Sequence, residues 1–356
     1  MRTHRLAVEL ARDFDVVLLS DELDLYGEPH AIDHAPFASV HLVRGRPDAS
    51  PRVPAGRIAR VEAHSHPALK GELRRILDMY RPVAVLVEHM ELAGLVDVAP
   101  AARPPLILDL HDVLLCPDDP AQTAADRFEL QLIDRFDAVV VSSAEDQALL
   151  GRRTVRLVRN GFDRALLAHY PPSRGHRSIL FVGPFRVPNN WQGIHEFLER
   201  AYPAVEAAVA GVSITIVGGR GARLLAQEHA CFARPSVRVH DEVDDLRPLL
   251  DACALTINPQ PELRGSSLKL IESLAAGRVC VTTRVGARGW LDLGLQGVVD
   301  AGRAADLAAT LIALLLDDDR RVALEAPRPG QLDAFTWDAA GRELRAQVRA
   351  VVERRK

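Results

Sequence analysis

The chain has 356 residues, of which 48% are hydrophobic and 26% are charged, a composition typical of a soluble globular protein with room for two domains. The formal net charge of -4 gives no reason to expect nucleic-acid binding. The half before Pro172 has 20 basic and 26 acidic residues and therefore a charge of -6, so charge gives no indication of peripheral contact with an anionic membrane.

The chain shows no recognisable signal peptide and no apolar run of about 18 residues, so we expect a cytoplasmic protein without a transmembrane segment. Its four cysteines, Cys116, Cys231, Cys253 and Cys280, lie far apart and form no Cys-x-x-Cys pair. We interpret them as thiols in a reducing compartment, and we expect no metal site.

The first half predicts short strands alternating with helices, the pattern of a parallel sheet covered on both faces. The chain opens directly in a helix pattern, at residues 1–15, with no strand before it. In a sheet of order 3-2-1-4-5 the first strand is central, so we expect a first domain that lacks its N-terminal strand and a functional protein that begins upstream of Met1. The predicted strands are 16–20, 39–43, 83–88, 105–110, 138–142 and 155–158.

A linker containing Asn-Gly and Pro-Pro follows, at residues 159–178, and the alternation then restarts. We expect two Rossmann-like, doubly wound domains, at 1–165 and 166–335, that face a cleft at the carboxyl ends of their sheets. A closing helix at 336–356 begins with Thr336 as its cap. The second set of predicted strands is 178–183, 212–219, 236–240, 254–259, 279–283 and 297–300.

The stretch RGSSLKLIESLAAG contains Lys269, one of only three lysines among 44 basic residues. A helix is predicted to begin near residue 268, which places Gly265, Ser266 and Ser267 at its N-terminus, where free amides attract phosphate. Lys269 adds a compact positive charge, and Glu272, one turn later, can accept hydrogen bonds from a ribose. This arrangement predicts a nucleotide site; the alternative is a surface helix with a Lys–Glu pair.

His111 follows the predicted strand 105–110 and is flanked by Asp109 and Asp112. Ligands bind at the carboxyl ends of parallel strands, so His111 can orient a donor sugar or contact an acceptor hydroxyl. The alternative is a histidine that is bonded to its neighbouring carboxylates as part of the loop. Glu88 and His89 also end a predicted strand. We interpret them as the start of a solvated loop, and the alternative is that they line the acceptor pocket.

The segment GSSLKLIESLAAGRVCVTTRVGARGW resembles the donor site of the GT-B glycosyltransferases, specifically the retaining family 4 group. That family has a Gly-rich turn, a Lys, a Glu-Ala-x-Ala-x-Gly helix and then VVxTxxGxxG. The resemblance covers nearly the whole chain in order, through RLAVELARDFDVVLLS, LDLHDV, RFDAVVVSSAEDQALL, VRNGFD, ILFVGPFRVPNNWQGIHEFL and FTWDAAGREL.

The resemblance implies an enzyme that moves a sugar from a nucleoside diphosphate sugar to a hydroxyl of a saccharide, lipid or small-molecule acceptor, with retention. Residues 1–165 would bind the acceptor, residues 166–335 the donor, and the helix 336–356 would cross back toward the first domain. His111 and Asp112 would be catalytic. The nucleotide sugar would be a co-substrate, and no cofactor or metal is expected.

The family pattern also assigns donor contacts. Glu272 would bind the ribose hydroxyls, and Lys269 with the Ser266 and Ser267 amides would hold the diphosphate. Where many members have a Glu, eight residues before Glu272, this chain has Arg264. After the first strand of the second domain the family has Gly-Arg and a later Lys. Here Pro184 and Phe185 separate Gly183 from Arg186, and the Lys position falls near Asn190. The expected donor-binding residues are Lys269, Glu272, Gly265, Ser266, Ser267, Arg186, Gly183 and Arg264.

Two other functions remain open from the sequence. A nucleotide-sugar epimerase can share this fold, and it would release an epimerised donor rather than a glycosylated acceptor. A non-catalytic protein that binds sugar nucleotides is a second alternative, because Arg264 replaces the family's Glu and the N-terminal strand with its acceptor loop is absent.

Overall fold

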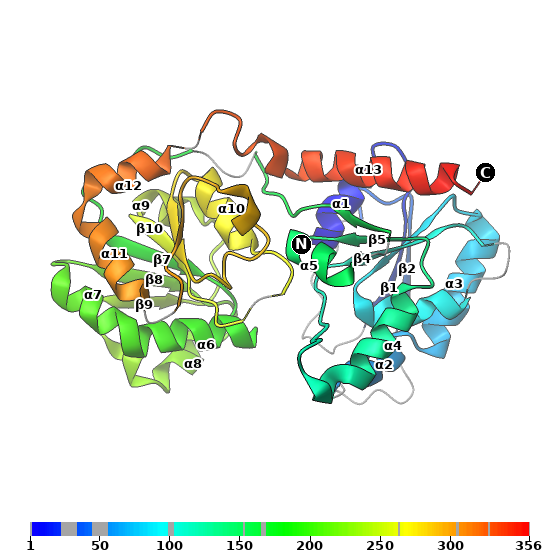
Figure 1. Cartoon of the computed structure of the whole chain (residues 1–356), viewed down its shortest axis with the longest axis horizontal. Helices are drawn as coiled ribbons and strands as arrows, with labels where there is room; N and C mark the ends of the chain where they lie inside the picture. Colours follow the sequence, from blue (N-terminus) through cyan, green and yellow to red (C-terminus); the bar gives the residue numbers. More distant parts are fainter. Residues whose placement is uncertain are drawn as a thin grey trace. The chain divides into compact units, whose positions relative to one another are not determined.

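The computed structural model describes residues 2–22, 34–44, 56–98, 103–151, 154–164, 169–262, 264–303, 306–326 and 328–355. The chain divides into two units, and the division is visible in Figure 1. Unit 1 comprises Met1–Arg159 and Trp337–Lys356, and unit 2 comprises Asn160–Thr336. The boundary predicted at residues 165 and 166 lies outside the described residues.

The strands of unit 1 form two parallel sheets. One sheet pairs β1 with β2, and the other has the order β3-β4-β5-β6. Among the described residues no pairing joins β1 to β3, so the sheet is interrupted where the sequence predicts a missing strand. All six strands predicted for this half are found, at β1 Val17–Glu22, β2 Ser39–Arg44, β3 Val85–Glu88, β4 Leu106–Leu110, β5 Ala138–Val141 and β6 Val155–Leu157.

Helices pack on the sheets of unit 1 through continuous apolar surfaces. One cluster joins β4 and β5 to the helices α2, η2 and α4, and a second joins α3 and η2 to side chains of β1, β2 and β3. The second cluster therefore holds the two sheets together without hydrogen bonds between them. The helices are α1 Arg2–Leu10, α2 Arg57–His64, α3 Pro67–Tyr80, η2 Met90–Val98, η3 Pro120–Gln122, α4 Thr123–Ile133, α5 Ala144–Leu150 and α13 Trp337–Glu353.

Unit 2 is built on one parallel sheet of order β12-β11-β10-β7-β8-β9. This is the doubly wound order in which the first strand, β7, lies beside the fourth, β10, and the chain winds outward in both directions. The point where the order reverses is where such sheets bind ligands. The strands are β7 Ser178–Val182, β8 Ser213–Val217, β9 Val237–His240, β10 Leu255–Asn258, β11 Val279–Thr282 and β12 Val298–Asp300.

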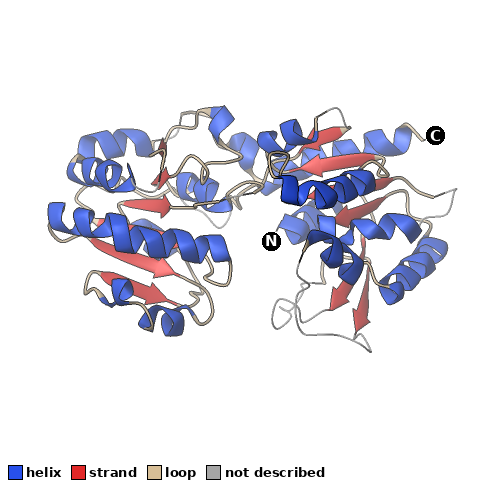
Figure 2. Ribbon diagram, turned by 60° about the horizontal axis from the view of Figure 1, so that its bottom comes forward, coloured by secondary structure: helices blue, strands red, loops and turns tan. Residues whose placement is uncertain are grey.

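Alternate residues of these strands face two helical layers, and Figure 2 shows helices on both sides of the strands. Ile179 and Phe181 of β7 face the layer of α6, α7, α8 and α11, whereas Leu180 faces α9. The helices are α6 Pro188–Glu196, η4 Phe197–Ala201, α7 Tyr202–Ala208, α8 Ala222–Gln227, η5 Ala230–Ala233, α9 Arg247–Ala252, α10 Leu268–Ala275, η6 Leu291–Leu293, α11 Leu307–Leu316, α12 Asp318–Glu325 and η8 Asp333–Phe335. No described helix is long and apolar enough to cross a membrane.

The helix α13 packs along α1, its partner in unit 1 (Figure 1). Its buried residues recur every three to four positions, as expected for one apolar face. At the crossing, a Cβ on Gly341 would lie 2.2 Å from the Cβ of Glu9, so the two helices touch through a glycine. Arg345 then binds both the carboxylate of Glu9, at 3.1 Å, and Asp13, at 2.9 Å. The first and last helices of the chain are thus fixed to each other.

Replacing Gly341 by alanine should separate α13 from α1, because the added methyl has no space. We expect Gly341→Ala to lower the free energy of unfolding by roughly 1–3 kcal/mol, the usual effect of overpacking. Denaturant unfolding followed by circular dichroism measures this change. The control is Gly71→Ala, since Gly71 lies exposed in α3 with no atom within 4 Å of the added Cβ. That change should be neutral or stabilising, and equal destabilisation by both variants would contradict the proposed contact.

Candidate functional site

Polar side chains gather in unit 2 where the strand order reverses. Gly183 directly follows β7, and Asn258 is the last residue of the adjacent strand β10. Gly183 has no room for a side chain, since a Cβ there would lie 2.9 Å from Asn190 Cγ. Asn190, in the first turn of α6, therefore lies directly against the end of β7. The topology brings these groups together at the carboxyl edge of the sheet.

Lys269 points into this group. Its Nζ donates to Asn190 Oδ1 at 2.5 Å and lies 3.4 Å from Asn258 Oδ1, with the amide of Gln260 beside it. The ammonium also lies 5.4 Å from the centre of the Phe181 ring. Burial lowers the pKa of Lys269 to about 8, although Cys280 and Glu272 act in the opposite direction. The structure thus holds a cation that is only partly hydrated and is close to losing its proton.

The helix α10 begins at Leu268, as predicted. Ser267 is the N-cap residue, but its side chain does not cap the helix. Instead its Oγ accepts a hydrogen bond from Asn258 Nδ2 at 3.1 Å. Gly265 has a φ of 64°, a left-handed conformation that suits glycine, and Ser266 Oγ accepts from Asn160 Nδ2 at 3.0 Å. The first amides of α10 have no intrahelical acceptor, which makes this end suitable for an anion.

The other predicted donor residues, Glu272, Arg264 and Arg186, lie at different places around this site. Glu272 is half-buried one turn after Lys269 on α10. Arg264 forms an ion pair with Glu262 at 3.5 Å. Arg186 is exposed in the turn between β7 and α6, and in the described part of the chain no contact joins it to Lys269. Lys269, Ser267 and Gly183 therefore share one site.

Asn190, Asn258 and Gln260 are the residues that the sequence interpretation did not assign. All three are at most 5% exposed, and each contacts Lys269 or its partners. A signal was present for Asn258, because a polar residue closes an otherwise apolar strand. For Asn190 the only signal was its place, near the Lys position of the family pattern.

A second polar cluster lies at the carboxyl end of the strands of unit 1. His111 Nε2 lies 2.8 Å from Glu88 Oε2, which also accepts a hydrogen bond from Thr3 Oγ1 at 3.2 Å. The His89 ring packs on the His111 ring with centroids 3.7 Å apart, and its φ of 67° is unusual for a residue other than glycine. Glu88 is half-buried and His89 is exposed, and both side chains contact His111.

Asp109 lies fully buried beneath this cluster and is neutralised by the guanidinium of Arg2, with Arg2 Nη2 3.0 Å from Asp109 Oδ1. The pairing fixes the start of α1 over the end of β4. Asp112, the other predicted catalytic residue, is exposed next to His111. Its charge favours the protonated form of His111.

Burial makes the groups around His111 neutral. It raises the pKa of Glu88 to about 8, helped by the charge of Asp109, and it lowers the pKa of His111 to about 4. Burial also lowers the pKa of His89. Near neutral pH, Glu88 is thus a carboxylic acid and His111 a neutral imidazole, so the pair can hold or pass one proton. Glu88, Asp109 and His111 are close enough to share an ion, but Arg2 already compensates the one remaining anion.

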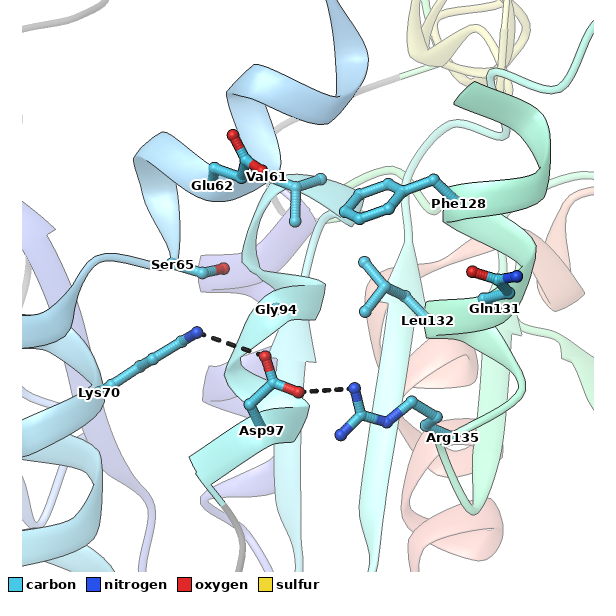
Figure 3. Close-up of a pocket in the computed structure, with 10 residues that line it drawn as sticks. All are labelled: Val61, Glu62, Ser65, Lys70, Gly94, Asp97, Phe128, Gln131, Leu132 and Arg135. Atoms are coloured by element: carbon cyan, nitrogen blue, oxygen red, sulfur yellow. Dashed lines mark hydrogen bonds and ion pairs between the residues drawn. The ribbon is translucent and has the colours of Figure 1, made fainter. Parts of the chain in front are cut away.

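A pocket in unit 1 lies away from the His111 cluster. A pocket of about 530 Å³ opens between α2, α3, η2 and α4, and Figure 3 shows Asp97 between two cations that point toward it. Asp97 pairs with Arg135 at 2.6 Å and with Lys70 at 3.4 Å. None of the predicted site residues lines this pocket. Its lining is Val61, Glu62, Ser65, Lys70, Gly94, Asp97, Phe128, Gln131, Leu132 and Arg135.

The raised pKa of Glu88 predicts a pH dependence of stability. An acid whose pKa is raised from 4.5 to about 8 on folding stabilises the protein fully below pH 4.5 and loses that effect as pH rises through 8. His111 and His89 have lowered pKa values and titrate below pH 7. Of these three groups, Glu88 therefore makes the largest contribution to the change in stability between pH 7 and 8. We expect the contribution of Glu88 to the free energy of unfolding to fall there by on the order of 1 kcal/mol.

Denaturant titrations at several pH values measure this slope. Glu88→Gln should remove it, because the amide has no proton to lose, whereas Glu62→Gln, at an exposed position in α2, should leave it unchanged. A wild-type slope that persists in Glu88→Gln would assign the effect to another group.

Comparison with known families gives two matches that follow each other along the chain. Residues 1–161 match the glycosyl transferase 4-like domain, and residues 176–317 match the glycosyl transferases group 1. The second match contains the Lys269 site and the first contains the His111 cluster. No curated protein matches the sequence.

Solved structures share the fold over almost the whole chain. Sucrose-phosphate synthase from Thermosynechococcus elongatus is 18% identical, with a TM-score of 0.76 over 98% of this chain and 92% of that protein. HepE of Anabaena, in complex with UDP and glucose, is 17% identical, with a TM-score of 0.70 over 98% and 96% of the two chains. The trehalose 6-phosphate synthase of Burkholderia multivorans is 12% identical, with a TM-score of 0.65 over 81% and 76%. The two consecutive family matches and this shared architecture show that the chain is a GT-B glycosyltransferase of the GT4-like group.

Proposed function

We propose that the enzyme transfers a sugar from a nucleoside diphosphate sugar to an acceptor hydroxyl with retention of anomeric configuration, and that unit 2 binds the donor. The observation that carries this proposal is the partly desolvated ammonium of Lys269 at the start of α10. It lies at the end of the neighbouring strands β7 and β10, where the strand order reverses. A lysine in this place matches the need of a diphosphate for compact positive charge. HepE, which has the same fold, is seen with UDP and glucose, and this supports a nucleotide-sugar donor.

In this proposal the diphosphate replaces Asn190 as the main partner of Lys269. The anion raises the pKa of the ammonium again, so binding converts a group that titrates at about 8 into a firmly charged one. The first amides of α10, at Ser267 and beyond, bind the same phosphates. As the bond between sugar and phosphate breaks, this fixed positive charge stabilises the departing nucleoside diphosphate, so the reaction needs no metal or cofactor.

Glu272 lies on α10 one turn beyond Lys269, and we assign it to the ribose hydroxyls. Gly183 provides the close approach of the backbone at the end of β7, where any side chain would strike Asn190. We assign Arg186 and Arg264 outer contacts with the donor.

The cluster in unit 1 provides the groups for the reacting sugar and acceptor. A neutral His111 with its proton on Nε2, which then donates to Glu88, can accept a hydrogen bond from a sugar hydroxyl at Nδ1. Asp112, exposed beside it, supplies a carboxylate for the same region. The hydroxyl oxygen of the acceptor then forms a bond to the anomeric carbon as the bond from that carbon to the phosphate oxygen breaks. The proton of the hydroxyl passes to the departing phosphate or to these side chains.

The first functional prediction concerns Lys269. Lys269→Ala should weaken binding of the donor by about 2 kcal/mol, or about 30-fold, since a charged hydrogen-bond partner of the diphosphate is lost. Calorimetry with UDP-, GDP- and dTDP-sugars measures the affinity and identifies the base. Lys269→Arg should not restore it, because the planar guanidinium cannot fit between Asn190 and Gln260 as an ammonium does.

Lys70→Ala is the matched control, since Lys70 pairs only weakly with Asp97 at 3.4 Å in unit 1. Both proteins should keep the same circular dichroism spectrum. Donor affinity that is unchanged in a folded Lys269→Ala protein would remove this site from the mechanism.

The second functional prediction concerns His111. His111→Ala should lower kcat, by on the order of 100-fold, while the affinity for the donor changes little, because unit 2 makes the nucleotide contacts. Release of the nucleoside diphosphate with a panel of acceptors gives kcat, and calorimetry gives the affinity. A fully active His111→Ala protein would show that the residue only organises its loop. If wild type instead yields an epimerised donor without any acceptor product, the chain is an epimerase.

A further inference from the structure

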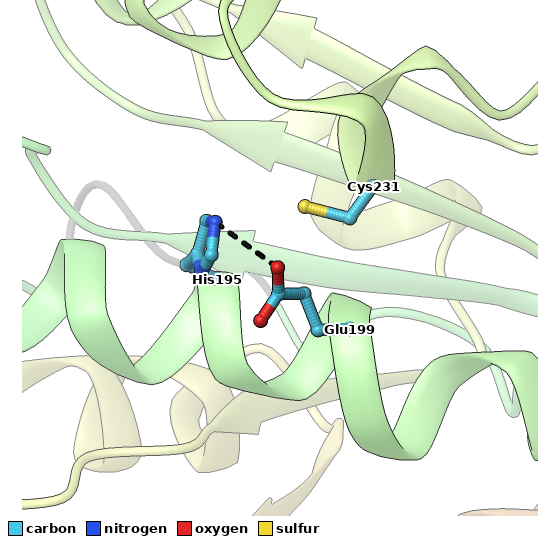
Figure 4. A group of neighbouring side chains, drawn as sticks. All are labelled: His195, Glu199 and Cys231. Atoms are coloured by element: carbon cyan, nitrogen blue, oxygen red, sulfur yellow. Dashed lines mark ion pairs between the residues drawn. The ribbon is translucent and has the colours of Figure 1, made fainter.

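A group of side chains with typical metal-binding atoms lies in unit 2, and none of its members belongs to the donor site. His195 comes from the last turn of α6, and Glu199 from the following π-helical turn η4. Cys231 belongs to η5, and His229 directly precedes that turn. Figure 4 shows the imidazole of His195, the carboxylate of Glu199 and the thiol of Cys231 pointing toward one another. Two separate segments therefore supply two candidate ligands each.

The separations suit ligands of a single ion. His195 Nε2 lies 3.2 Å from His229 Nδ1 and 3.6 Å from Glu199 Oε1. The ligand atoms of His195, Glu199 and Cys231 all lie within 4.8 Å of one another. Two nitrogens that each lie about 2.0–2.1 Å from a tetrahedral zinc ion are about 3.3 Å apart. The two imidazoles thus already have the spacing of zinc ligands, and the carboxylate of Glu199 and the thiol of Cys231 lie close to His195.

The aromatic side chains of Trp191 and Phe232 pack against the two imidazoles. The ring of Trp191 stacks on Phe232 with an interplanar angle of 4°, and its centre lies 5.2 Å from His195 and 4.9 Å from His229. On the opposite side Glu199 is half exposed, at 51%, which leaves a route for an ion. An apolar shell on one side and an accessible ligand on the other are features of bound-metal sites.

Neighbouring cations are paired with other carboxylates. Arg200 forms an ion pair with Glu196 at 3.0 Å, and Arg234 pairs with Glu206 at 2.8 Å. The carboxylate of Glu199 pairs with the imidazole of His195. It also lies in a π-helical turn, a distortion that is frequent where helices carry functional groups.

We propose that His195, Glu199, His229 and Cys231 bind a zinc ion. The set of two nitrogens, one sulfur and one oxygen suits zinc, whereas magnesium and calcium prefer oxygen ligands alone. The bound ion links the long helical segment of α6 and η4 to the turn that leads into β9. It thereby fixes the β9 edge of the sheet, and its role is structural, because the four ligands leave no open coordination position for a substrate.

Titration of the full chain with Co²⁺ after treatment with a chelator tests the site. Cobalt reports a thiolate ligand by a charge-transfer band in the near ultraviolet and a tetrahedral site by strong visible bands. We expect one Co²⁺ per chain with both signals, displaced by Zn²⁺, which binds more tightly to such ligands. The thermal midpoint of unfolding should also rise with Zn²⁺.

Variants assign the ligands. Cys231→Ser should abolish the charge-transfer band, and His195→Gln should weaken binding by at least about tenfold. Cys116→Ser and His240→Ala, which replace the same residue types elsewhere, should bind as wild type does. Circular dichroism of the metal-free proteins shows whether each variant is folded, and Cys231→Ser is expected to be, since its side chain is only half-buried.

Three results would overturn the inference. The first is a wild-type protein that gives no charge-transfer band, and the second is a band that survives Cys231→Ser. The third is binding that disappears in Glu88→Gln instead, which would place the ion at the cluster of unit 1. Glycosyl transfer by metal-free wild type should persist, so loss of zinc binding and loss of the proposed activity are separate outcomes.

Discussion

The arrangement of the donor site depends on one topological constraint. The strands β7 and β10 are neighbours, and the rest of the sheet extends from them in opposite directions. Because these adjacent parallel strands continue the sheet in opposite directions, the helices that follow them leave to opposite faces. Asn190 on α6 and Lys269 on α10, 79 residues apart in the chain, therefore meet at a hydrogen bond of 2.5 Å. Gly183, which has no Cβ, leaves room for Asn190 at this contact. Asn258, the polar last residue of β10, lies beside the ammonium of Lys269.

Burial acts in the same chemical direction at the two polar clusters. In each unit it favours the uncharged form of an ionisable group: the acid of Glu88, the imidazole of His111 and, in part, the amine of Lys269. Neutral groups lose little when water leaves, and they regain charge when a ligand of opposite sign arrives. The clusters differ in their fixed charges, because Asp109 and Arg2 compensate each other in unit 1. A substrate with two negative phosphates is therefore better matched to unit 2.

The fold could be predicted from the sequence because its strands are short, continuous apolar runs, and each of the twelve predicted strands is present. The start of α10 was also predictable, since Gly265 and two serines precede an apolar helical pattern. The contacts of the site were not, because they join distant positions: Glu88 with His111, Lys269 with Asn190, and Arg2 with Asp109. Local spacing did offer His195 and Glu199 four residues apart, and His229 and Cys231 two apart. Only packing shows that these pairs meet.

The depressed pKa of Lys269 has a consequence for chemical labelling. The chain has three lysines, and amine-directed reagents attack the neutral amine, so reactivity at mildly alkaline pH favours the lysine that loses its proton first. Lys269 is half-buried but opens onto the proposed phosphate position, which shields it whenever a nucleotide is bound. The scarcity of lysine and the polarity of one buried site together make Lys269 a reporter of occupancy, readable by mass spectrometry of the peptide that contains it.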